Sequence, residues 1–167
     1  MRGFGSSLAI ALCLILAAGI AARQAHAQEI RVDVPVVLKE AKVVFNLDHR
    51  AFEGDQPTGL QFLGIMVPGL KAASTTARFV AIFHGAAGYM LLDDAAYDRV
   101  RNWRGGNPYK QQIAALIAQG VQIEECAETM RQHRWSNADL LPGVKVNTGA
   151  NFRIVQLVQD GFVQLQP

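Results

Sequence analysis

The sequence is poor in cysteine, with Cys13 and Cys126 as the two cysteines among 167 residues. It also lacks an excess of charge of either sign, since 16 lysine and arginine residues face 14 aspartate and glutamate residues. Outside residues 8–21 it contains no long apolar run. A nearly neutral surface argues against general nucleic-acid binding, and a chain without a second apolar run has no other candidate membrane span.

The N-terminal segment has the three parts of a secretory signal peptide. Arg2 supplies a positive charge, Leu8 to Ala21 is apolar, and Ala25-His26-Ala27 is a small-x-small cleavage pattern. We therefore predict a signal peptide over residues 1–27 and a periplasmic protein. The apolar run is too short for a membrane span, so we expect no membrane association after cleavage.

Cleavage after Ala27 changes both the charge and the cysteine content of the chain. Arg2 and Arg23 leave with the signal peptide and no acidic residue does, so 14 basic residues remain beside 14 acidic ones. Cys13 leaves as well. The mature chain then has one cysteine, Cys126, which has no internal disulfide partner. It is a buried inert thiol, an intermolecular partner or a reactive group.

Several sequence motifs of common enzymes are absent. The chain has no G-x-S-x-G motif, no P-loop and no dinucleotide-binding fingerprint, and we expect no cofactor. Half of the residues are hydrophobic and 18% are charged, which is typical of a globular domain. We predict an extended N-terminal arm over residues 28–40 and one domain over residues 41–167.

Hydrophobic periodicity predicts alternating strands and helices in residues 41–167. The expected strands are 42–47, 78–83, 121–125, 144–147 and 162–165. The expected helices are 58–73, 93–103, 107–119, a short one after Cys126, and 148–161. This alternation predicts an open, mainly parallel sheet with helices on both faces. The strand 121–125 alternates polar and apolar residues, which places it near an edge or under an oligomer interface.

Local signals refine the helices. Pro68 is expected to kink or shorten the first helix. Gly105-Gly106 is expected to close the second helix, and Asn107 with Pro108 to begin the third. Ser136 with Asp139 resembles a capping box for one short turn. The last helix carries four apolar residues: Phe152, Val155, Leu157 and Val158.

Potentially reactive side chains follow the predicted strands. In an open α/β sheet ligands bind beyond the carboxyl ends of the strands. The strand ends supply these residues: Asn46, Asp48, His49, His84, Gly85, Gly88, Cys126, Asn147, Thr148 and Gly149. We therefore expect a binding or catalytic site at this edge of the sheet.

Cys126 stands where a strand gives way to a helix. Unpaired N–H groups at the helix N-terminus favour the thiolate, whereas Glu124, Glu125 and Glu128 oppose it. Arg131, His133 or an arginine of a neighbouring subunit would offset these glutamates. Sequence alone leaves a reactive and an inert thiol equally supported.

The histidines allow more than one interpretation. His84 suits an acid, a base, a hydrogen-bond donor or a metal ligand, and its simplest role is a hydrogen bond at the edge of the core. His49 lies in a polar loop. No pair of candidate ligands has a metal-binding spacing, so we expect no metal site.

Three blocks together resemble the DsrE/DsrF-like family, in its exported branch. They are AKVVFNLDH (41–49), VAIFHG (80–85) and the region from Gly120, with GVQIEEC, Thr129, ADLLPGVKVNTGA and VQLVQDGFVQLQP. The resemblance implies a three-layer α/β/α domain around a five-stranded, mostly parallel sheet. It also implies a homo-oligomer, either a trimer or a hexamer. The acidic pair before Cys126 and the export signal depart from the cytoplasmic carriers, and a tRNA-modification role is not carried over.

In sulfur-relay members of that family, a cysteine after a G-V-x-x-x-x-C strand carries sulfur as a persulfide, and Cys126 matches that position. We therefore assign Cys126 and His84 as candidate catalytic residues. The candidate ligand-binding residues are Asn46, His49, Gly85, Thr129, Asn147 and Thr148. The leading hypothesis is a periplasmic persulfide carrier or sulfurtransferase that exchanges sulfur with a donor or acceptor protein. The alternatives are an oligomeric, non-catalytic module for a small ligand and, ranked lower, a metal-binding protein.

Overall fold

The computed structural model describes residues 30–167, and the predicted signal peptide lies outside the described residues. Residues 37–167 form one compact unit, and residues 30–36 belong to a separate one. Residues 30–36 contain no helix or strand, and their apolar side chains are exposed. Among the described residues, no helix is long and apolar enough to cross a membrane.

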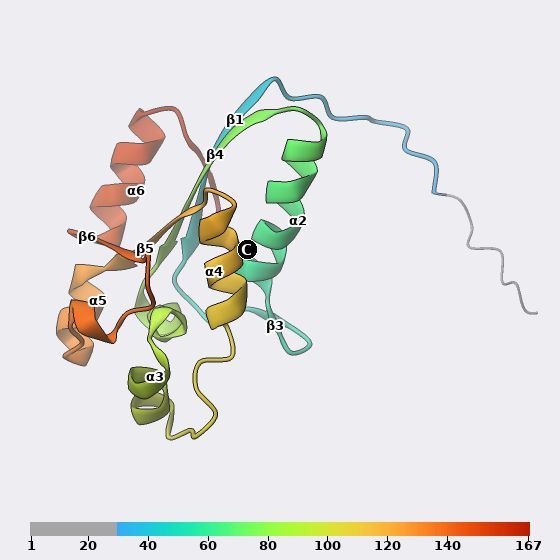
Figure 1. Cartoon of the computed structure of the whole chain (residues 1–167). Helices are drawn as coiled ribbons and strands as arrows, with labels where there is room; N and C mark the ends of the chain where they lie inside the picture. The colour runs from blue at the N-terminus through green and yellow to red at the C-terminus, as the bar shows by residue number, and fades with distance from the viewer. Residues whose placement is uncertain (1–29) are drawn as a thin grey trace, which may run out of the picture. The chain divides into compact units, whose positions relative to one another are not determined.

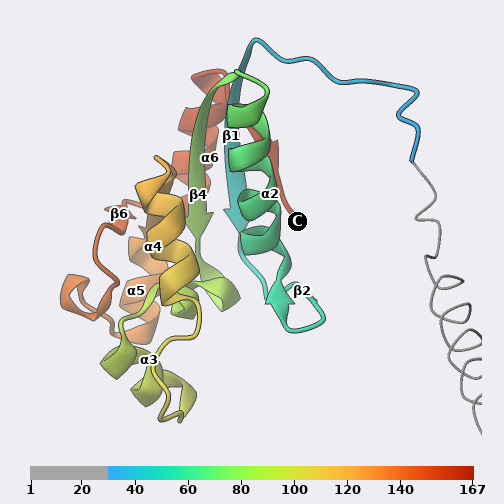
Figure 2. The same ribbon diagram turned by 45° about the vertical axis from the view of Figure 1, so that its right-hand side comes forward.

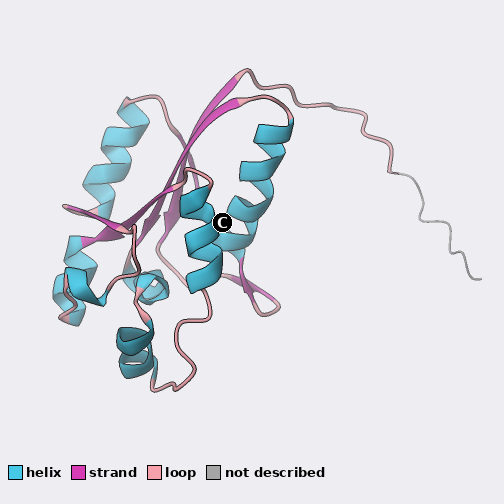
Figure 3. Cartoon of the chain, viewed as in Figure 1, coloured by secondary structure: helices cyan, strands magenta, loops and turns pink. Residues whose placement is uncertain are grey.

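The compact unit contains a five-stranded sheet in which every pairing is parallel (Figures 1 and 3). Its order is β6-β5-β4-β1-β7. The strands are β1 (Glu40–Leu47), β4 (Thr76–Phe83), β5 (Gln122–Cys126), β6 (Lys145–Asn147) and β7 (Val163–Leu165). This confirms the predicted α/β fold. The alternating strand β5 is second from one edge, as expected, beside the short β6.

Helices cover both faces of the sheet (Figures 1 and 2). One face packs on α2 (Thr58–Ala72), α4 (Lys110–Ala118) and the 3-10 helix η1 (Gly85–Leu91). The other face packs on α6 (Ala150–Gln159). The remaining helices are α3 (Asp94–Arg101), α5 (Ala127–His133) and the 3-10 turn η2 (Asn137–Asp139).

The central strands explain why the sheet is parallel and buried. β1 and β4 pair along their whole lengths, from Glu40 beside Thr76 to Leu47 beside Phe83. Successive residues face opposite sides, so Phe45 enters the larger core and Val44 the smaller one. Both side chains are fully buried. Continuous apolar strands of this kind are stable only when both faces are covered.

Several helix boundaries differ from the prediction. α3 ends at Arg101 because Asn102 takes the left-handed conformation, with φ 50°, ahead of the glycine pair. α4 begins at Lys110, since the buried Asn107 Oδ1 caps the preceding turn by accepting from the Tyr109 N–H at 2.8 Å. α2 continues through Pro68 to Ala72. The polar loop around Gly54 contains a small hairpin, β2 (Phe52–Glu53) with β3 (Gln56–Pro57).

The apolar face of α6 is only partly the one that the sequence indicated. Ala150, Ile154 and Leu157 are buried at helical spacing against the sheet. Phe152, Val155 and Val158 are 79%, 56% and 47% exposed. The helix therefore has one apolar face in the core and a second on the surface.

Candidate functional site

The carboxyl ends of the strands bring the predicted site residues together. Cys126 is the last residue of β5 and directly precedes α5. His84 directly follows β4, the neighbouring strand. On the other side of β5 lies β6, which leads through Gly149 into α6. Three parallel strands thus deliver their following residues to one edge of the sheet.

A surface pocket of about 250 Å³ lies at this edge, and we call it the cysteine pocket. Its lining residues come from η1, α5 and α6 and from the turns before them: His84, Gly85, Cys126, Glu128, Thr129, Gln132, Gly149, Ala150, Asn151 and Phe152. Four of the predicted site residues, Cys126, His84, Gly85 and Thr129, therefore line one pocket.

Backbone N–H groups surround the Cys126 sulfur. The Ala150 N–H, at the start of α6, donates to Sγ at 3.3 Å. Burial by itself would raise the pKa of the thiol, because Cys126 is only 4% exposed. Hydrogen bonds from the backbones of Thr129, Ala150 and Glu128 outweigh the burial, so the pKa of Cys126 lies below its usual value. The start of α5 and the start of α6 both stabilise the thiolate.

Glu124 is neutralised by an arginine that sequence reasoning missed. Arg153 of α6 reaches across the sheet face, with Nε 3.1 Å from both carboxylate oxygens and Nη2 3.0 Å from Oε1. The Glu124 side chain is 3% exposed. Gln122 and Asn147 donate further hydrogen bonds to this carboxylate. The charge of Glu124 is therefore matched on the same face of β5 that carries Cys126.

Glu125 is fully buried on the opposite face of β5. Its Oε1 accepts a hydrogen bond from the Cys126 N–H at 3.2 Å, and its Oε2 has no hydrogen-bond partner within the described residues. Burial raises the pKa of Glu125 well above its usual value. A Cβ at Gly88 would lie 2.8 Å from Oε1, so the glycine of η1 makes room for this carboxyl group. The raised pKa favours the protonated, neutral form of Glu125, which does not repel a thiolate.

The third glutamate, Glu128, also forms an ion pair with an arginine. Arg131, one of the residues proposed to offset the glutamates, donates to Glu128 Oε2 from Nη2 at 2.7 Å and from Nε at 3.0 Å. Both side chains are exposed, so the pair is weak but removes the local excess of negative charge. The three glutamates therefore do not dominate the field at Cys126.

His84 is held in a defined orientation. The ring Nε2 is 2.7 Å from Asn46 Oδ1, and the backbone N–H of His84 donates to the backbone oxygen of Leu47 at 3.0 Å. Desolvation lowers the pKa of His84, and Asp48 offsets only part of this effect. The imidazole is therefore neutral near pH 7. With Nε2 donating to Asn46, Nδ1 is left as a hydrogen-bond acceptor.

Gly85 and Thr129 connect β4 to α5. The Gly85 N–H donates to Thr129 Oγ1 at 2.9 Å. Gly85 has φ +53°, and a Cβ there would lie 3.0 Å from Asp48 O, so the turn favours glycine. This bond fixes the Thr129 hydroxyl, which is itself a hydrogen-bond partner of Cys126.

Comparison with known proteins agrees with this geometry. The model of the DsrE/DsrF-like family matches residues 42–167. This chain belongs to the DsrE/DsrF-like family. Membership of this family indicates a role related to sulfur relay. No curated protein sequence matches the chain.

Two solved structures resemble this DsrE/DsrF-like chain. MTH1491 from Methanobacterium thermoautotrophicum, described as a protein of unknown function, is 24% identical with a TM-score of 0.60. The match covers 76% of this chain and 99% of that one. The ychN protein from E. coli is 18% identical with a TM-score of 0.47, covering 77% and 99% of the two chains. The first similarity supports the shared fold.

Four other predicted ligand-binding residues do not line the cysteine pocket of this DsrE/DsrF-like protein. Asn46 is buried and bonds through its Oδ1 to His84 Nε2. His49 pairs with Asp48 and lies beside a different, small cavity. Thr148 is exposed. Asn147 is turned toward Glu124, to which its Nδ2 donates at 3.1 Å. Residues that follow a strand alternate in direction, so position at the sheet edge does not by itself place a side chain in the pocket.

Metal ligands do not converge in the described part of the chain. Within residues 30–167, no group of three His, Cys, Asp or Glu side chains is arranged to hold a metal ion. His49, which would complete a set with His84 and Cys126, bonds to Asp48 instead.

The lowered pKa of Cys126 gives a direct prediction. We expect alkylation of the native protein by iodoacetamide to reach half its maximal rate at a pH below that found for the same cysteine in urea. The thiolate fraction sets the rate, and the N–H groups that favour the thiolate exist only in the folded state. Rates measured by mass spectrometry across pH test this, and equal midpoints in both states would contradict it.

Proposed function

We propose that this protein is a periplasmic sulfur carrier in which Cys126 accepts a sulfane sulfur atom and holds it as a persulfide. The observation that carries the proposal is the environment of Sγ. The pKa of Cys126 is held below its usual value by backbone N–H groups at the starts of two helices. The same donors would stabilise the negative charge of a persulfide, whose pKa is lower than that of a thiol.

The chemical step needs no external oxidant when inorganic polysulfide is the donor. The Cys126 thiolate attacks the terminal sulfane sulfur, and a bond forms between Sγ and that atom. The bond that joined this atom to the rest of the polysulfide breaks. The shortened polysulfide leaves with the electron pair, and a persulfide anion remains on Cys126. Transfer to an acceptor thiolate is the same step in reverse.

The pocket residues support this step. Cys126 is 4% exposed, but it lines a pocket of about 250 Å³ that admits a small linear donor. His84 stands on the same pocket as a neutral imidazole with an acceptor nitrogen, which suits it to take the proton of a protonated thiol. Thr129 supplies both a backbone N–H and a hydroxyl.

Intact mass spectrometry after exposure to polysulfide tests the proposal. Wild-type protein is expected to gain the mass of one sulfur atom or more, and dithiothreitol is expected to remove it. Cys126→Ala is the matched control and is expected to gain none, because Cys126 is the only cysteine of the mature sequence. Equal sulfur gain by both proteins would overturn the carrier function.

Export and assembly are part of the same proposal. Cleavage after Ala27 would give the intact mass of a chain that begins at Gln28, which the same spectrum reports.

The exposed Phe152, Val155 and Val158 on α6 support a homo-oligomer, a trimer or a hexamer, because they form an apolar stripe on the surface. Phe152 also lines the cysteine pocket, so a neighbouring subunit or a sulfur donor or acceptor protein on α6 would meet the site. Native mass spectrometry measures the assembly.

A further inference from the structure

A second pocket shares Gly85 with the cysteine pocket and is otherwise lined by different residues. It has a volume of about 170 Å³, and we call it the arginine pocket. Its lining residues come from the loop after β1, from η1, from α3 and from the end of α5: Arg50, Gly85, Ala86, Tyr89, Val100, Arg101, His133 and Trp135. Segments far apart in the sequence therefore converge on it.

The arginine pocket is positively charged and is not neutralised by the protein. In the part of the chain that the structure describes, no carboxylate lines it. Among residues 30–167, neither Arg50 nor Arg101 makes an ion pair, whereas Arg99, Arg131 and Arg153 each pair with an acidic side chain. Two unpaired guanidinium groups that face a common pocket attract an anion.

An aromatic ring fixes the guanidinium of Arg101. Its Cζ lies 4.4 Å from the centroid of the Tyr89 ring, a cation–π geometry. Tyr89 is 7% exposed, and its ring packs against those of Tyr97 and Tyr109 with centroid distances of 5.9 and 6.3 Å. A guanidinium that is already oriented loses little entropy when it binds an oxyanion through two parallel hydrogen bonds.

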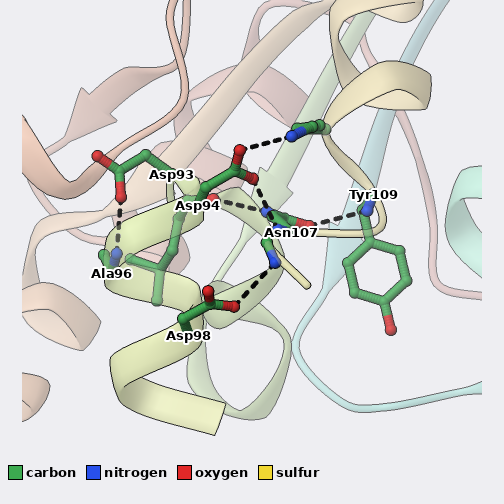
Figure 4. A network of polar contacts seen from close by, with 9 residues as sticks. Asp93, Asp94, Ala96, Asp98, Asn107 and Tyr109 are labelled. Carbon is green, nitrogen blue, oxygen red and sulfur yellow. Dashed lines mark hydrogen bonds and ion pairs between the residues drawn. The ribbon is translucent and has the colours of Figure 1, made fainter. Parts of the chain in front are cut away.

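The acidic residues of α3 are occupied elsewhere (Figure 4). Asp93 accepts from the Ala96 N–H at 2.7 Å and caps the helix. Asp94 accepts from the Asn107 N–H at 2.8 Å, and Asp98 accepts from the Gly106 N–H at 2.9 Å. These bonds tie α3 to the loop that follows it, and Arg101 has no carboxylate partner within residues 30–167.

The remaining walls limit the size and kind of the ligand. His133 and Trp135 stack with their ring centroids 4.6 Å apart, and Val100 adds an apolar surface. Sites for drug-sized organic ligands occupy roughly 300 to 1,000 Å³. A pocket of about 170 Å³ instead suits an ion of a few heavy atoms. Apolar walls beside the arginines reduce solvent screening and strengthen their attraction for it.

We propose that the arginine pocket binds a small oxyanion with two negative charges, of the sulfate and thiosulfate class. Arg50 and Arg101 hold its oxygen atoms, and His133 and Trp135 form the wall against which it rests. This site is separate from Cys126 and does not depend on the proposed sulfur transfer. Its position next to Gly85 places a bound sulfur oxyanion beside the cysteine pocket.

Titration of the ¹⁵N-labelled protein with sodium sulfate, and separately with sodium thiosulfate, tests the proposal at constant ionic strength set by chloride. We expect saturable NMR shifts of the Gly85 and Ala86 amides and of the Trp135 indole N–H. Arg50→Gln and Arg101→Gln are expected to weaken binding at least tenfold, about the loss of one charge-assisted bond. Arg101→Lys is expected to fall between wild type and glutamine.

Two matched controls separate this site from a general charge effect and from the thiol. Arg104→Gln removes the same charge from the loop after α3 without touching the pocket, and it is expected to change affinity less than twofold. Cys126→Ser is expected to bind normally. The proposal is overturned if no saturable shift appears at these amides with either anion, or if Arg104→Gln weakens binding as much as Arg101→Gln. The amide spectrum itself shows whether each variant is folded.

Discussion

Replacing Arg153 by methionine is expected to lower the free energy of unfolding by about 3 kcal/mol, because it leaves the Glu124 carboxylate buried without its counterion. Methionine retains much of the apolar stem of the arginine, so little of the loss comes from packing. The Glu124 side chain is 3% exposed and that of Arg153 is 24% exposed, so water cannot replace the guanidinium fully. Urea denaturation at pH 7 measures the effect.

Two control variants give the Arg153 prediction its specificity. Arg131→Met breaks the exposed pair with Glu128 and is expected to cost less than about 1 kcal/mol. The double variant Glu124→Gln with Arg153→Met removes both charges and is expected to recover most of the stability. Similar losses of unfolding free energy in Arg153→Met and Arg131→Met would show that the buried ion pair contributes no more to stability than the exposed one.

The same variant reports on the thiol. Glu124 and Cys126 lie on one face of β5, and Arg153 is the cation that matches this glutamate. Without Arg153, an uncompensated negative charge near the sulfur disfavours the thiolate. The pH midpoint of Cys126 alkylation is therefore expected to rise in Arg153→Met and to return toward the wild-type value in the double variant.

Glu125→Gln is expected to make the protein more stable than wild type near pH 7 and equally stable in acid. Burial raises the pKa of Glu125 in the folded state well above its value in the unfolded chain. Between those two pKa values the folded state binds one proton more than the unfolded state. The free energy of unfolding of wild type therefore falls as pH rises, by about 1.4 kcal/mol per pH unit.

Glutamine resembles the protonated carboxyl group in size and still offers an oxygen that accepts from the Cys126 N–H. Its contribution does not titrate, so the difference between variant and wild type should grow as pH rises from below the unfolded pKa. Glu128→Gln, at an exposed position, is the matched control and is expected to show no such trend. A constant difference between Glu125→Gln and wild type at every pH would mean that Glu125 is ionised in the folded protein.

The sequence was sufficient for the order of elements and for the edge of the sheet that carries the site. Continuous apolar runs located the strands that end after Asn46 and before His84, because burial on both faces demands runs of that kind. Alternation of polar and apolar residues located the strand that ends at Cys126. Because the strands are parallel, their carboxyl ends lie at the same edge of the sheet whatever the strand order. The predicted end of α3 was wrong because more than one residue can end a helix. Asn102 takes the left-handed conformation, and α3 ends there before the chain reaches Gly105-Gly106.

The electrostatics of the site were decided by tertiary structure. Sequence proximity made Glu124, Glu125 and Glu128 look like one acidic cluster around Cys126. In the fold the first pairs with Arg153, the second is buried on the other face with a raised pKa, and the third pairs with Arg131. The partner of Glu124 lies on α6, and no spacing rule connects the two positions. Arg50 and Arg101 meet at one pocket for the same reason.

The amino-acid sequence by itself determined an α/β domain with Cys126 at the end of a strand. Periodicity and turn chemistry are local properties, so they can be read along the chain. The tertiary structure alone decided which charges are matched, which carboxyl group has a raised pKa and which N–H groups face the Cys126 sulfur. These depend on distances between segments remote in sequence, and Coulomb and desolvation energies vary steeply with such distances.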